Sequence, residues 1–220
     1  MGVILRHFWR YFMRMRRPLL WRGLLLFLFA SQSCCQARAA VEPAGQVRQS
    51  VDPVHSGKRV QKAKTDAASY IFRYYNSSLS MDKANEYARY VMEASSRFSV
   101  DPALITAIIV KESRVKVNAR SKYAVGLMQV YWKLHRNTIM AQFPHIRTEK
   151  ILMEPRNNIM VGTWIFSRYM AHCKGNVTKA LRRYLGSQAN RYVALVTKYR
   201  GHYTERVLLN LQHASKRAVS

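Results

Sequence analysis

Apolar and polar positions in the second half of the chain follow the spacing of amphipathic helices. From Met81 onward, apolar residues recur every three or four positions directly after Ser80, whose hydroxyl can cap a helix that begins there. A second helix is predicted from Asp101-Pro102, because Asp is a favoured N-cap and Pro fits the first helical position. Alternating strand patterns are nearly absent, so we predict a single all-α domain over about residues 66–220. Further helices are predicted at about 126–140, 158–173, 177–185, 188–198 and 202–213.

The first forty residues have the order of an export signal. Five arginines and no acid precede an apolar run, and an A-x-A cleavage pattern follows at residues 37–39. The uninterrupted apolar stretch, residues 23–30, is much shorter than the roughly 20 residues of a membrane-spanning helix. We predict a signal peptide over residues 1–39, with an uncleaved anchor in contact with the membrane as the alternative and Met13 or Met15 as alternative starts. The protein is then expected in the periplasm or exported to the cell wall.

Residues 40–65 have the composition of a flexible basic linker. From Val41 to Thr65 there is no aromatic residue and no Leu, Ile or Met, whereas two prolines, two glycines and several Lys and Arg are present. Such a segment offers little apolar surface to a core. We therefore expect the folded domain to begin at about residue 66.

Charge narrows the class of partner. The chain carries 37 Lys and Arg against 11 Asp and Glu, a net charge of +26, while 49% of its residues are hydrophobic. This apolar content is typical of a folded core and excludes a disordered basic tail. The charge favours an anionic partner, which is a nucleic acid, a membrane surface or a cell-wall polymer. The one cysteine beyond the signal, Cys173, is expected to be a small buried hydrophobe, and no ligand spacing for a metal is present, so we expect no metal and no cofactor.

One carboxylate continues an apolar stripe. Glu112 lies four residues after Ile108 and seven after Ile105, on the same face of the predicted helix. Burial beside aliphatic side chains raises the pKa of a carboxyl group, as a general acid near neutral pH requires. Periodicity leaves open that Glu112 lies in a last turn open to solvent, or that it pairs with Arg114 or Lys116.

Further motifs follow this carboxylate in a defined order: Glu112-Ser113, Ser121, Gly126-Leu127-Met128-Gln129, Asn158 to Gly162, and Ala180 to Ser187. Over about residues 80–205, this order and spacing resemble those of the soluble lytic transglycosylases, which are lysozyme-like enzymes that cleave peptidoglycan. The resemblance implies an all-α lysozyme-like fold. It also implies cleavage of the β-1,4 bond between N-acetylmuramic acid and N-acetylglucosamine without water, which leaves a 1,6-anhydro ring.

The resemblance implies one catalytic residue, Glu112, and places Ser113 and Tyr184 in the substrate-binding site around it. Glu112 matches the single acid/base of the family, Ser113 follows it in the motif, and Tyr184 matches the tyrosine that hydrogen-bonds the catalytic carboxyl. Ordinary glycoside hydrolases need two carboxylates, whereas one suffices when the 6-hydroxyl of the sugar is the nucleophile. The remaining acids after Glu112 are taken as structural: Glu149, Glu154 and Glu205.

The same resemblance implies a glycan groove. Ser121 matches the polar residue that contacts the sugar near the scissile bond, and Gln129 matches the glutamine that lines the groove, with Met128 beside it. Gly126 is expected to let the glycan or the backbone approach closely at a helix start, with an ordinary turn glycine as the alternative.

Two positions depart from the family pattern. The loop at residues 122–125 is one residue short, and Leu185 stands where the family has an asparagine after the tyrosine. The shorter loop is expected to shift Ser121, and the lost amide to weaken the support of the carboxylate. We expect activity to survive with an altered rate or substrate preference.

Three other functions compete with this prediction. Ser113 to Lys116 fits the S-x-x-K pattern of serine acyl-transferases, but no companion motif or strand is present. A lysozyme-type hydrolase of the same bond and a non-catalytic module that binds the wall or another anionic polymer are the remaining alternatives. We expect a monomer that acts on peptidoglycan glycan strands, with no nucleic-acid partner because of the export signal. A secretion, pilus, flagellar or conjugation machine is compatible as a further partner.

Overall fold

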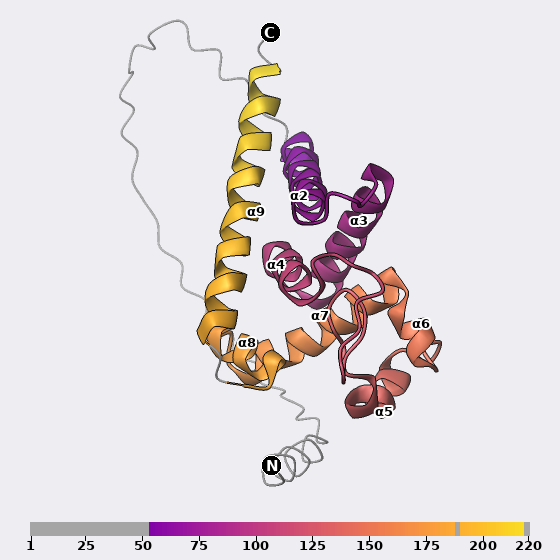
Figure 1. Cartoon of the computed structure of the whole chain (residues 1–220). Helices are drawn as coiled ribbons and strands as arrows, with labels where there is room; N and C mark the ends of the chain where they lie inside the picture. Colours follow the sequence, from indigo (N-terminus) through magenta and orange to yellow (C-terminus); the bar gives the residue numbers. More distant parts are fainter. Residues whose placement is uncertain (1–52, 188–189, 218–220) are drawn as a thin grey trace, which may run out of the picture. The chain divides into compact units, whose positions relative to one another are not determined.

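The computed structural model describes residues 53–187 and 190–217, and in these residues it contains helices and two isolated β-bridges but no strand. The predicted all-α class is therefore confirmed (Figure 1). The predicted signal peptide, residues 1–39, and residues 40–52 lie outside the described residues. No helix in the described part of the chain combines the length and the hydropathy needed to cross a membrane. The helices are α2 (Pro53–Tyr75), α3 (Met81–Phe98), α4 (Pro102–Ser113), α5 (Trp132–Gln142), α6 (Glu149–Met153), α7 (Pro155–His172), α8 (Val177–Leu185) and α9 (Asn190–Arg217).

The segment before residue 66 is helical. Helix α2 begins at Pro53, so the expected flexible linker is wrong for residues 53–65. Helix α9 lies against this part of α2: the Asn210 amide donates to the carbonyl of Ala63 (3.1 Å), and the Tyr203 hydroxyl donates to the carbonyl of Lys64 (3.1 Å). The segment lacks large apolar residues, but the small side chain of Ala63 is 5% exposed and is sufficient for close helix contact. Its Lys, Arg, Gln and Ala residues are good helix formers.

Both predicted helix caps are present. The Ser80 hydroxyl accepts a hydrogen bond from the backbone N–H of Lys83 (3.3 Å) at the start of α3. The Asp101 carboxylate accepts from the backbone N–H of Ala103 (2.9 Å) at the start of α4, whose first residue is Pro102. Each cap satisfies a donor that the first turn of a helix leaves unpaired.

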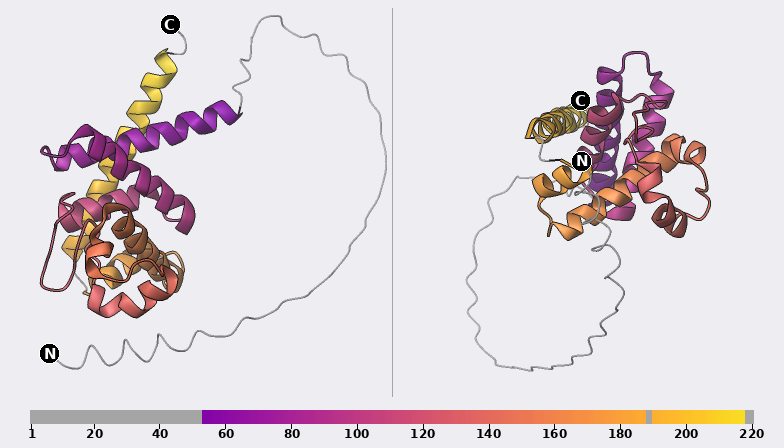
Figure 2. Two further views of the ribbon diagram at one scale, coloured as in Figure 1. Left: turned by 90° about the vertical axis from the view of Figure 1, so that its right-hand side faces the viewer. Right: turned by 60° about the horizontal axis from the view of Figure 1, so that its bottom comes forward.

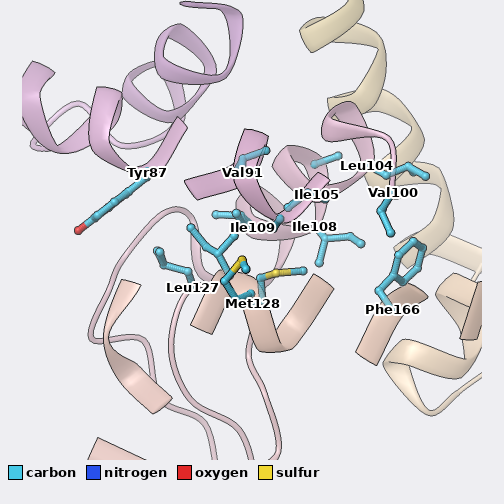
Figure 3. Close-up of a cluster of buried hydrophobic side chains, with 14 of the residues drawn as sticks. Tyr87, Val91, Val100, Leu104, Ile105, Ile108, Ile109, Leu127, Met128 and Phe166 are labelled. Carbon is cyan, nitrogen blue, oxygen red and sulfur yellow. The ribbon is translucent and has the colours of Figure 1, made fainter. Parts of the chain in front are cut away.

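Helix α4 lies at the centre of the fold. All its residues from Ala103 to Val110 are buried, because α2, α3 and α9 pack around it. Figure 3 shows Ile108 and Ile109 gathered with Leu127 and Met128 from the loop after α4. A helix that is apolar on all sides is typical of such a central position. The polar exception in its last turn, Glu112, is consequently held close to the core.

The helix predicted to begin at Gly126 begins instead at Trp132. Before it, Val125 and Val130 exchange backbone hydrogen bonds (3.1 and 3.0 Å) and close a tight loop. Gly126 and Gln129 adopt left-handed backbone conformations, with φ of 79° and 48°. A right-handed helix does not accommodate these φ values, which explains why the apolar spacing of this stretch was misleading.

The C-terminal helices agree with the prediction except at their ends. Helix α7 begins three residues earlier than predicted, because Glu154-Pro155 supplies its N-cap and first residue. Helix α8 matches its predicted range. Cys173, at the end of α7, is half-buried. Two helices were predicted for 188–198 and 202–213, but a single helix, α9, extends through Gly201. It runs past α2 and α4, as Figure 2 shows. The short α6 was not predicted.

Candidate active site

Glu112 is a partly buried carboxylate in the last turn of α4. Burial raises the pKa of Glu112 above its ordinary value, while a hydrogen bond from Tyr192 and the charge of Lys111 act to lower it. The predicted direction of the pKa shift is therefore confirmed. Within the described residues, Glu112 forms no ion pair with Arg114 or Lys116, which were the alternatives that periodicity left open.

The hydrogen-bond partner of Glu112 comes from the first turn of α9. The Tyr192 hydroxyl donates to Oε1 of Glu112 over 2.5 Å, and the tyrosine side chain is 3% exposed. Burial and the neighbouring carboxylate raise the pKa of Tyr192 far above its ordinary value, so the hydroxyl keeps its proton and remains a donor. The ammonium of Lys111 lies 5.2 Å from the centre of the same ring. The carboxyl group is thus held in one orientation.

Tyr184 was expected to hydrogen-bond the carboxyl group, and this expectation is wrong. Its hydroxyl donates instead to the backbone carbonyl of Met128 (2.8 Å). The ring packs edge-on against Phe166, with 5.8 Å between ring centres, and burial raises the pKa of Tyr184 well above its ordinary value. Tyr184 therefore ties α8 to the loop that holds Gln129. The helix predicted at 188–198 includes Tyr192, but no spacing rule indicated that its side chain reaches Glu112.

Asn158 holds the loop between α4 and α5. Its side-chain oxygen accepts from the backbone N–H of Met128 (2.8 Å), and its amide donates to the carbonyls of Val125 (3.0 Å) and Leu152 (3.2 Å). A Cβ atom on Gly126 would lie 2.3 Å from this amide nitrogen. Gly126 therefore leaves room for the Asn158 side chain, and it does so within a loop and not at a helix start.

Met128 lies in the core and not on the groove surface. It is fully buried, and a Cβ atom on Gly162 of α7 would lie 2.6 Å from its Sδ atom. The hydroxyl of Thr163 also contacts this sulfur at 3.7 Å. This burial argues against a contact between Met128 and the substrate. The flexible Met128 side chain fills the space above Gly162 and thereby packs the loop against α7.

The Ser113 hydroxyl is hydrogen-bonded to the backbone around it. Its hydroxyl donates to the carbonyl of Ile109 (3.0 Å) and accepts from the N–H of Val115 (3.1 Å), and the residue is 6% exposed. It thereby holds a turn in which Arg114 and Val115 have φ of 51° and 60°, a rare conformation for a β-branched residue. The hydroxyl is thus engaged within the chain, which argues against a contact of Ser113 with substrate and against a nucleophilic serine. Its function is to end α4 directly after Glu112.

Ser121 is exposed and Gln129 is half-buried. Gln129 donates both amide hydrogens, to the carbonyls of Ala119 and Gly126 (3.1 Å each), which leaves its side-chain oxygen as an acceptor. Ser121 is exposed at the tip of the loop, where its hydroxyl accepts from the N–H of Ala124 (3.1 Å). Beside it, the exposed ring of Tyr123 lies 5.5 Å from that of Tyr131.

The two departures from the family pattern lie at the surface. The short loop closes through the N–H of Ser121 and the carbonyl of Ala124 (2.9 Å). Leu185, at the end of α8, is 37% exposed. The carboxylate receives its hydrogen bond from Tyr192 on another helix, so its support does not depend on an amide at position 185.

The other acids near this region have structural partners. Glu149 pairs with Arg120 (2.5 Å), and Glu154 accepts from the Asn157 amide (3.0 Å) at the start of α7, as an acid there favours the helix. No carboxylate of the described residues is among the groups that shift the pKa of Glu112. The site therefore combines one partly buried acid, one tyrosine donor and a hydrogen-bonded loop that carries Ser121 and Gln129.

A family model described as the transglycosylase SLT domain matches residues 89–199, which is half of the chain. The matched segment includes Glu112, the loop with Gln129, Asn158 and both tyrosines of the site.

Proposed function

We propose, because this chain belongs to the transglycosylase SLT domain family, that Glu112 is the catalytic acid/base of its reaction. Membership of the family means a lysozyme-like all-α fold and lytic transglycosylase activity on peptidoglycan, outside the cytoplasm. The observation that carries the assignment of Glu112 is its position: it is a partly buried carboxyl that receives the Tyr192 hydrogen bond, and no carboxylate in the described part of the chain is among the groups that shift its pKa.

The proposed reaction breaks one bond and forms another without water. Glu112 gives its proton to the glycosidic oxygen while the bond from C1 of N-acetylmuramic acid to that oxygen breaks. The 6-hydroxyl of the same sugar bonds to C1, and its proton passes to the Glu112 carboxylate. The enzyme regains its starting form, N-acetylglucosamine leaves with a free 4-hydroxyl, and the muramic acid carries a 1,6-anhydro ring.

The environment of Glu112 suits both proton transfers. Burial raises its pKa, so the acid form is retained closer to neutral pH. Tyr192 stabilises the carboxylate that forms after proton donation and keeps it from rotating away. A hydrolase that activates water with a second carboxylate fits less well, because Glu149 and Glu154 are engaged elsewhere.

The residues predicted to contact the sugar divide into two groups. Ser121 and Gln129 are proposed to contact the glycan, because each has a polar atom outside the core. Four others are proposed to support the site from behind: Ser113, Gly126, Met128 and Tyr184. We further propose a monomeric enzyme with a signal peptide over residues 1–39 and a linker over 40–52, and a secretion, pilus, flagellar or conjugation machine as a partner.

Product analysis tests this function. The purified protein is incubated with peptidoglycan, and the soluble products are identified by mass spectrometry. Anhydro-muropeptides are expected, and Glu112→Gln is expected to lower their release about 100-fold or more, while Glu149→Gln serves as the carboxylate control. Products with reducing ends would assign hydrolysis instead, and the absence of soluble products would favour a binding module. Full activity of Glu112→Gln would refute the catalytic assignment.

A further inference from the structure

A pocket lies between α2 and α9, outside the segment that matches the family. Its volume is about 250 Å³, and its walls come from residues 70–74 of α2 and 202–209 of α9. The family model matches residues 89–199, so none of these residues belongs to it. The proposed catalytic reaction does not involve this pocket.

Two exposed aromatic rings form the α2 side of the pocket. Tyr70 is 44% exposed and Tyr74 is 64% exposed, and their rings stack with 6.2 Å between centres. The ring of Tyr75 packs edge-on against that of Tyr74, with 5.0 Å between ring centres. Neighbouring exposed rings are unfavourable in water but give a ligand a flat apolar surface.

Charged and polar groups form the α9 side. The guanidinium of Arg206 lies 3.9 Å from the centre of the Tyr70 ring, and its buried Nε–H has no hydrogen-bond acceptor in the described part of the chain. Nδ1 of His202 is hydrogen-bonded to the Tyr75 hydroxyl (2.6 Å). Glu205 also lines the pocket and is exposed. The pocket therefore joins aromatic faces to hydrogen-bonding groups along one edge.

We propose that this α2–α9 pocket is a second glycan-binding site, which holds one N-acetylhexosamine unit of peptidoglycan away from the catalytic carboxylate. A pyranose ring has an apolar face that stacks on tyrosine and a rim of hydroxyl and amide groups that pairs with Arg, Glu and His. A volume of about 250 Å³ suits a single ring, since pockets for drug-sized ligands measure roughly 300–1,000 Å³. The choice of peptidoglycan as the ligand rests on the proposed function.

The position of the pocket indicates what the second site does. At about 1.5 Å per residue along a helix, the stretch of α9 from Tyr192 to His202 and Leu209 spans roughly 15 to 25 Å. The two sites therefore bind different sugars, from separate parts of one strand or from neighbouring strands. Binding at the second site keeps the enzyme on insoluble peptidoglycan and raises the effective concentration of bonds at Glu112.

Sedimentation with insoluble peptidoglycan tests the second site. All variants are made in the Glu112→Gln protein, so that the polymer is not consumed. Tyr74→Ala is expected to weaken binding about tenfold, which corresponds to loss of one aromatic contact. Tyr74→Trp keeps a ring and is expected to bind as the parent does. Leu208→Ala removes a side chain of α9 that is 56% exposed and does not line the pocket, and it is expected to have no effect.

Two results would overturn the proposal. One is equal binding by Tyr74→Ala and Leu208→Ala, with circular dichroism verifying that both variants are folded. The other is loss of the Tyr74-dependent binding when an amidase has removed the stem peptides, since the peptide and not the glycan would then be the ligand. Both experiments measure binding and not cleavage. Their outcome is therefore independent of whether the protein releases anhydro products.

Discussion

The hydroxyl of Tyr192 lies 2.5 Å from the carboxyl oxygen Oε1 of Glu112, although 80 residues of sequence separate them. The contact joins the last turn of α4 to the first turn of α9. Helix α9 is fixed further along by Tyr203, which is buried and bonds to the backbone of α2. The geometry of the carboxyl group therefore depends on how a C-terminal helix packs against the centre of the fold.

Tyr192→Phe removes this hydrogen bond and keeps the ring. We expect the turnover rate to fall about 10-fold to 100-fold, in line with a hydrogen bond to a charged group. The bond lowers the pKa of Glu112, so its loss is expected to raise that pKa further and to move the alkaline limb of the rate profile to higher pH. Rates of anhydro-product release across pH measure both effects.

Tyr203→Phe is the matched control for that variant. Tyr203 is on the same helix, is 3% exposed like Tyr192 and also donates one hydrogen bond, to the carbonyl of Lys64. It is expected to lose about 1 kcal/mol of stability without moving the alkaline limb. Equal shifts in the two variants would show that Tyr192 has no positioning role.

The raised pKa of Glu112 predicts how stability changes with pH. The folded protein binds this proton more tightly than the unfolded chain, whose carboxyl has the ordinary value of 4.5. The stabilisation is therefore complete below pH 4.5 and is lost as the pH rises through the folded-state pKa. Urea titrations should show Glu112→Gln gaining stability relative to the parent over this window, by at most about 1.4 kcal/mol per pH unit. Parallel stability curves would contradict the raised pKa.

Gly126→Ala is expected to disrupt the loop that carries Gln129. The new Cβ would meet the Asn158 amide at 2.3 Å, in addition to the strain of φ at 79°. Gly175→Ala separates the two effects, because Gly175 has φ of 80° and open space around it. We expect a loss of about 1–2 kcal/mol at Gly175 and a clearly larger loss, with reduced activity, at Gly126. Similar unfolding free energies for the two variants would mean that Asn158 moves aside without cost.

Two glycines inside helices are expected to respond in opposite ways to alanine. Gly201→Ala places a methyl group in open space in α9 and should stabilise the protein by about 0.5–1 kcal/mol, since alanine favours a helix. Gly162→Ala in α7 would meet the Met128 side chain at 2.6 Å and should cost about 1–3 kcal/mol. Thermal unfolding distinguishes them, and a stabilising Gly162→Ala would show that Met128 is loosely packed.

The local chemistry of the chain could be predicted from its residues in order. The caps at Ser80 and Asp101 are properties of side chains next to the helices that they begin, and a helical period of 3.6 residues places Glu112 on the stripe of Ile108. The raised pKa of the carboxyl follows from that stripe. The order and spacing of the motifs after Glu112 also resemble those of the family.

Contacts between distant segments were decided by the tertiary structure. Tyr184 and Tyr192 both lie on buried faces, and only the packing of α8 and α9 determines that the first reaches a backbone carbonyl and the second reaches Glu112. In the same way, Ser113 and Met128 turn inward because backbone and α7 surround them. Periodicity identifies which face of a helix is buried, whereas the atom that a side chain meets there depends on the relative placement of whole helices. Sequence thus determined the acid and its family, and tertiary packing decided which residue holds the acid in position.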